Sequence, residues 1–162
     1  MNPSIAERVA FGRPLEAEDD NEIHSAPRPT TALFGRLALA AIFFVSGFAK
    51  LTDTTGTAAH MTQAGIGHAE TLAVIAGICE IAGAIALATG FLTRLGALGL
   101  FLFLIPTTII FHGFWNVEGA ERMTQMVNFM KNLAIGGGLL GVVAYGAGKY
   151  SIDSVLRRPQ EA

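Results

Sequence analysis

Four apolar stretches of about twenty residues each stand out along the chain, separated by polar segments. They cover residues 31–51, 71–92, 95–112 and 126–147. At a rise of about 1.5 Å per residue, each is long enough as a helix to cross the roughly 30 Å hydrocarbon core of a bilayer. Because no water is available there to satisfy backbone groups, such stretches cross as helices. The pattern predicts an all-α integral membrane four-helix bundle over residues 31–150.

The polar segments predict how the rest of the chain is organised. Residues 1–30 contain six of the 13 acidic residues and form a polar, acidic N-terminal tail, which is either a solvated segment or a docking segment for a partner. Residues 52–70 hold three glycines and predict a loop or a surface helix, and residues 113–126 form a second loop. Residues 151–162 are a short polar C-terminal tail.

The basic residues are distributed unevenly on the two sides of the predicted spans. Eight of the eleven flank one side, whereas Lys50, Arg122 and Lys131 lie on the other. Because positive flanks stay in the cytoplasm, the N and C termini are both predicted to be cytoplasmic. Arg36 and Lys50 lie near opposite ends of the first span, and we expect their side chains to reach opposite interfaces.

Composition agrees with a membrane protein and excludes some functions. Hydrophobic residues make up 51% of the chain and charged residues 15%. The net charge of −2 and the scattered basic residues argue against nucleic acid as a partner, since binding phosphates needs clustered Lys and Arg. Cys79 is the only cysteine, so neither an intrachain disulfide nor a two-thiol relay can form.

Glu80 lies near the middle of the second apolar stretch. An unpaired carboxylate at that depth costs about 3 kcal/mol on insertion scales. Small residues recur around it at helical intervals of three and four and place it on one stripe, made up of Ala73, Gly77, Ala84 and Ala88. We therefore expect Glu80 to face the interior of the bundle, where it is neutral, hydrogen-bonded or paired with a cation.

A polar cluster is predicted at the outer end of the bundle. Its candidate members are Lys50, Glu80, His112, Asn128, Lys131 and Asn132. Glu80 lies about two or three turns deeper than the others, so a direct pair with Lys50 requires staggered helices. The cluster is either a site for a polar head group such as that of a quinone, or a structural knot that fixes helix register.

Other patterns give no site. His60, His68, Glu70 and His112 fall on one side of the membrane, but their spacing matches no dedicated metal site, and we assign none. No phosphate loop, nucleophile elbow or Cys-x-x-Cys pair is present in the sequence. We assign no catalytic residue, and whether the chain takes part in catalysis stays open.

Four segments carry a resemblance to a known family: SGFAKL (46–51), ICEIAGAIALATGFLTRLGAL (78–98), TTIIFHGFW (107–115) and NFMKNLAIGGGLL (128–140). Together they resemble the DoxX family of small bacterial membrane proteins. Its relatives include a membrane subunit of an archaeal thiosulfate:quinone oxidoreductase. The resemblance implies a multi-pass protein of the bacterial inner membrane and a redox-linked role for Lys50, Glu80, His112, Lys131 and Asn132.

Three functional hypotheses follow. The first is a non-catalytic accessory or anchoring subunit of a larger membrane complex, with residues 1–30 as a docking segment for other subunits. The second is a quinone-interacting subunit of an oxidoreductase, with no cofactor held in the chain itself and electrons supplied by a partner. The third is a transporter of a small solute or proton, although no inverted repeat is visible.

Overall fold

The computed structural model describes residues 29–157. Its elements are α2 (Pro29–Thr52), α3 (Thr54–Gln63), α4 (Ala69–Thr89), α5 (Thr93–Phe111), the 3₁₀ turn η2 (Phe114–Asn116), α6 (Gly119–Tyr145) and α7 (Ile152–Leu156). The helices α2, α4, α5 and α6 contain the four segments that are long and apolar enough to cross a membrane. This confirms the all-α four-helix membrane architecture. The N-terminal tail proposed for docking lies almost entirely outside the described residues.

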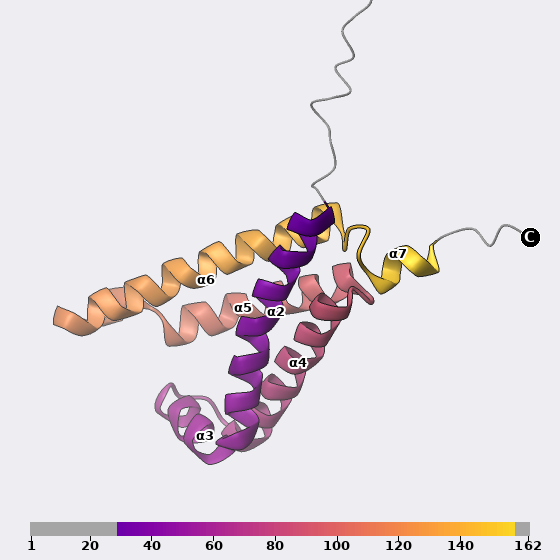
Figure 1. Ribbon diagram of the computed structural model, residues 1–162. Coiled ribbons are helices and arrows are strands. Elements are labelled where there is room, and N and C mark those ends of the chain that lie inside the picture. The colour runs from indigo at the N-terminus through magenta and orange to yellow at the C-terminus, as the bar shows by residue number, and fades with distance from the viewer. Residues whose placement is uncertain (1–28, 158–162) are drawn as a thin grey trace, which may run out of the picture.

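The four long helices form two pairs that meet at one end and separate toward the other. Helix α2 packs along α4, and α5 packs along α6, while α4 also contacts α5. Figure 1 shows α6 and α2 close together where the chain enters α7, and far apart at their other ends. Helix α3 packs against α4 at the end farthest from α7. Helices α2 and α6 therefore diverge with distance from α7.

Of the two predicted connections, residues 52–70 contain a surface helix, one of the two predicted alternatives, and residues 113–126 are partly helical where a loop was predicted. The chain between the first two spans forms α3, and the Asp53 side chain caps its first turn by accepting a hydrogen bond of 2.9 Å from the backbone N–H of Gly56. Helix α6 begins at Gly119, ahead of the apolar stretch that starts at 126, because residues 120–125 contain neither Gly nor Pro. At 27 residues it extends about 40 Å, longer than the hydrocarbon core.

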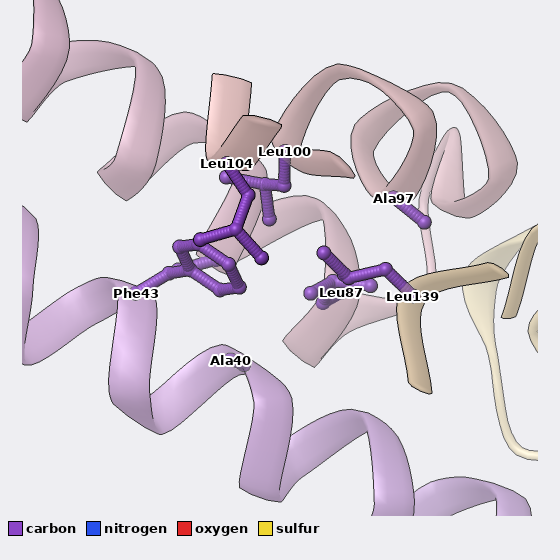
Figure 2. Packing of buried hydrophobic residues seen from close by; sticks show 8 residues of the cluster. Ala40, Phe43, Leu87, Ala97, Leu100, Leu104 and Leu139 are labelled. Carbon is purple, nitrogen blue, oxygen red and sulfur yellow. The ribbon is translucent and has the colours of Figure 1, made fainter. Parts of the chain in front are cut away.

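The main core lies at the end of the bundle where the two pairs meet. Eight buried residues from all four long helices form it: Ala40, Phe43, Ala84, Leu87, Ala97, Leu100, Leu104 and Leu139. Figure 2 shows their side chains gathered between the helices. Most other large apolar side chains face outward, as is required where lipid is the solvent.

Arg36 is part of this packed end, and its side chain is buried in protein where we expected it to extend toward an interface. Its side chain is 1% exposed. It donates hydrogen bonds to the carbonyl oxygens of Leu87 (3.0 Å) and Tyr150. The physical reason is that α4 ends inside the bundle, where the last carbonyls of a helix lack partners of their own. Arg36 satisfies one of them and also joins α4 to the chain before α7.

Asp153 of α7 holds the start of α5. Its carboxylate accepts hydrogen bonds from the backbone N–H groups of Leu92 (2.9 Å) and Thr93 (3.0 Å), while its own N–H donates to the carbonyl of Gly90 (2.9 Å). Burial by itself raises the pKa of this carboxyl, but the bonds from Thr93 and Leu92, together with the charge of Arg157, lower it below its ordinary value. Residues 151–157 are thus an integral part of the bundle end.

Candidate functional site

A cavity of about 780 Å³ lies between the two helix pairs, with walls from α2, α3, α4, α5 and α6. Five of the six residues of the predicted polar cluster line it: Lys50, Glu80, His112, Lys131 and Asn132. The volume is in the range of small-molecule binding sites. The sixth, Asn128, does not line the cavity.

Lys50 and Glu80 form an ion pair inside this cavity. The Lys50 ammonium lies 2.9 Å from Glu80 Oε2 and 3.2 Å from Oε1. Ser46, one turn before Lys50, accepts a hydrogen bond of 2.7 Å from the ammonium and donates one of 3.2 Å to Glu80 Oε1. Glu80 is only 3% exposed, so it points into the bundle as the stripe of small residues predicts. The carboxylate thus has both a countercharge and a hydroxyl donor.

The ion pair exists because α2 and α4 are staggered. Helix α2 ends at Thr52, and α3 covers the first turns of α4 in its place, with Ala58 and Met61 packing against Ala69, Ala73 and Ala76. The end of α2 therefore lies beside the middle of α4. The prediction that Glu80 lies deeper in the membrane than Lys50 assumed that both helices reach the outer interface at the same level.

The remaining polar residues of the cluster are tied to neighbours on α5 and α6. His112 Nδ1 is hydrogen-bonded to Gln125 Oε1 at 2.9 Å. The Asn132 amide donates to Thr108 Oγ1 at 3.0 Å, and that hydroxyl donates to the Leu104 carbonyl at 2.6 Å. These bonds fix the orientation of the imidazole and of the amide on the wall opposite α2.

Lys131 differs from Lys50 in its surroundings. Its ammonium donates to Asn128 Oδ1 at 3.0 Å, one turn earlier on α6, which explains why Asn128 lies beside the site without lining it. In residues 29–157 the only ion pair is the one between Lys50 and Glu80. Lys131 therefore contributes a positive charge to the cavity that no carboxylate of the described chain neutralises.

Several lining residues were not assigned from the sequence. Ser46 could have been found, since it lies one helical turn from Lys50 on the same face. His60 appeared only in the rejected metal set, yet its ring stacks on Phe111 with centroids 5.1 Å apart and lines the cavity. The sequence did not indicate that His60 lines a cavity, because its position depends on how α3 packs. Within residues 29–157 no group of three His, Cys, Asp or Glu side chains is arranged to hold a metal.

The cavity runs beside the main core along α2 and ends before it on α4 and α6. On α2 its lining extends from Lys50 to Ala38 and includes the core residue Phe43. On α4 its lining residue is Glu80, seven residues before the core residue Leu87, and on α6 its lining ends at Ile135, four residues before the core residue Leu139.

Comparisons with known proteins agree with this architecture. A model of the DoxX family matches residues 31–113. The inner membrane protein YphA of Escherichia coli (strain K12) is 34% identical over 128 residues, which cover 79% of this chain and 91% of that protein. The inner membrane protein YqjF of the same organism is 35% identical over 126 residues, 78% of this chain and 92% of that protein. No solved structure matches the chain.

Both relatives are named as inner membrane proteins, and this chain has four helices of spanning length and composition. It is a multi-pass inner membrane protein embedded in the lipid bilayer. The family match covers about half of the chain and the two relatives extend over nearly four-fifths of it. The protein therefore belongs to the DoxX family.

Proposed function

We propose that this protein is a non-catalytic subunit of a larger membrane complex and that its cavity binds the polar head of a quinone-like molecule. The observation that carries the proposal is the ion pair between Lys50 and the buried Glu80, which lies in the wall of a cavity of about 780 Å³. Ionisable groups at membrane depth are expensive, and they mark ligand or ion sites more often than they serve packing.

Stability alone is a weak reason for such a pair. Burying two charges carries a desolvation penalty that their attraction often fails to repay, and apolar replacements of similar volume are frequently as stable. The pair gives a ligand an ammonium donor at a depth where lipid offers none. A quinone carbonyl, which accepts hydrogen bonds and lacks a donor, suits such a group.

The cavity also offers donors on more than one wall. Lys50 comes from α2, while Lys131 and Asn132 come from α6 and His112 follows the end of α5. A quinone ring carries carbonyl oxygens on opposite edges, so donors on two walls can hold it from both sides. The aromatic rings of Phe103 and Phe111 line the same space and give the ring apolar faces to pack against.

The redox step is assigned to a partner subunit. The chain has one cysteine, Cys79, which is exposed on α4, so it has no pair of thiols to pass electrons. Electron exchange with a bound quinone then requires a group supplied by another chain. Binding is favoured over transport because on α4 and α6 the cavity ends before Leu87 and Leu139, which are fully buried in the core.

The test is quinone binding to the purified full-length protein in detergent. Glu80→Gln and Lys131→Ala should each weaken binding about tenfold or more. Lys131→Ala removes a charge-assisted donor worth roughly 1.5–3 kcal/mol, and Glu80→Gln removes the carboxylate that holds the Lys50 ammonium in place. Glu118→Gln and Lys149→Ala are matched controls, because both residues are exposed and neither lines the cavity. Circular dichroism checks that all variants keep their helices. Unchanged binding in both cavity variants would reject the site.

A further inference from the structure

We propose that the ligand is amphipathic and that its apolar tail lies in the open side of the cavity between α2 and α6, reached directly from the bilayer. This inference rests on the proposed function and adds the position of the tail and the route of entry. It follows from the shape of the cavity wall on α2 and from the separation of the two helices.

The cavity extends along α2 well beyond the polar residues. Its lining on that helix runs from Lys50 and Ser46 through Val45, Ile42 and Ala41 to Ala38. Twelve residues of helix correspond to about 18 Å, more than a single ring needs. Past Ser46 these side chains are apolar or small, so the space changes from polar to apolar along its length.

This apolar part of the cavity is open to the side. Within the described chain, Val45 remains 67% exposed and Ile42 38% exposed although both line the cavity. Helix α6 approaches α2 at Leu39, where an added Cβ on Gly138 would lie 3.3 Å from Leu39 Cδ2. The two helices separate with distance from α7 (Figure 1). In a membrane the opening faces lipid, so an apolar molecule can enter without crossing water.

We assign the apolar part of the cavity to the tail of the ligand whose head contacts Lys50. The reason is that the ion pair and the apolar strip, formed by Ala38, Ala41, Ile42 and Val45 of α2, line one continuous cavity. A tailed ligand whose head binds at the pair therefore places its tail along the strip. A lipid acyl chain or a helix of a second copy would compete for the same strip, and the experiment below separates these cases.

The experiment compares two ligands with the same benzoquinone ring, one carrying a polyprenyl tail and the other a methyl group in its place. Ala41→Trp fills the exposed strip, and Ala82→Trp places the same bulk on an exposed position of α4 away from the cavity. Binding is measured for the full-length protein in detergent. We expect Ala41→Trp to weaken the tailed quinone about tenfold, as overpacking does, and to leave the short analogue within about twofold. Ala82→Trp should change neither.

The outcomes separate this inference from the proposed function. If neither quinone binds the unaltered protein, the proposed function fails. If both bind and Ala41→Trp affects both equally or neither, the tail assignment is overturned and the head site stands. If added phospholipid displaces the tailed quinone but does not displace the short analogue, the strip is a lipid site instead. Dissociation of a dimer by Ala41→Trp would assign the strip to a second copy.

Discussion

Gly47 of α2 lies directly against Gly77 of α4, so closely that a Cβ added to Gly47 would sit 2.8 Å from the Gly77 carbonyl oxygen. The same Cβ would meet Ile81 at 2.9 Å and the Glu80 Cβ at 3.0 Å. The contact lies one turn from Lys50 on α2 and at the level of Glu80 on α4. Close helix approach at small residues therefore positions the ion pair.

Gly47→Ala should destabilise the protein by about 1–3 kcal/mol, because the nearest atom belongs to the backbone and has little freedom to yield. Gly35→Ala on the same helix is the matched control. A Cβ there meets nothing within 4 Å, so the better helix propensity of alanine should raise stability by up to about 1 kcal/mol. Thermal unfolding in detergent measures both. Equal effects of the two substitutions would contradict the close contact.

The pair of Lys50 and Glu80 should behave as a coupled unit in a double-mutant cycle. Lys50→Met leaves the 3%-exposed Glu80 without its cation, and Glu80→Gln leaves the ammonium without its carboxylate. We expect each single change to cost about 3–5 kcal/mol, and the double change to cost less than the sum of the two. Stability of the four proteins in one detergent gives the coupling energy, and strict additivity would show that the charges do not interact.

Arg36→Lys should be far more damaging than its conservative chemistry suggests. A single ammonium cannot reproduce the fork that reaches the carbonyls of Leu87 and Tyr150, so at least one buried oxygen loses its donor, at about 1–3 kcal/mol. Arg94→Lys is the matched control, because Arg94 is exposed and makes one bond to the Ala144 carbonyl. A similar loss of melting temperature in both variants would argue against the role of Arg36.

Stability should fall at acidic pH through Asp153. Its pKa in the folded protein lies below the ordinary value of about 3.9, so its contribution is present above that value and is lost as the pH falls toward the folded pKa. Asp153→Asn should remove this pH dependence and cost about 1 kcal/mol at neutral pH, as loss of a helix cap does. Unfolding measured between pH 3 and 7 tests this, with Glu118→Gln as the comparison. An unchanged pH profile in Asp153→Asn would contradict the cap.

The predicted orientation can be tested independently of any ligand. A fluorescent protein that matures only in the cytoplasm, fused to the C terminus, should fluoresce because the basic flanks keep that end inside. A fusion at Thr55, in the first turn of α3, should stay dark. The opposite pattern would show that the polar end of the cavity faces the cytoplasm, which contradicts the predicted orientation.

The sequence predicted those features that depend on one helix at a time. The inward direction of Glu80 follows from the spacing of Ala73, Gly77 and Ala84, because helix periodicity is local. The grouping of Lys131 with Asn132 and Asn128 was local for the same reason. These residues needed no knowledge of how the helices pack against one another.

Features that depend on how the helices are placed relative to one another were not predicted, or were predicted incorrectly. Arg36 binds carbonyls 51 and 114 residues away, and no local pattern distinguishes that from a side chain reaching an interface. The Lys50–Glu80 pair depends on the stagger of α2 and α4, which the apolar stretches do not reveal. The position of His60 on Phe111 depends on α3 folding back, which the glycines of residues 52–70 left open.

The connection between α2 and α4 has a consequence for how this site can vary. Helix α3 packs on the first turns of α4, where α4 would otherwise have α2 for a neighbour, and its ten residues link the end of α2 to α4. Lengthening or shortening α3 by a turn would slide α2 along α4 by about 5.4 Å, enough to carry Lys50 out of reach of Glu80. The charge partners inside the membrane are thus selected by the length of a helix that does not cross it.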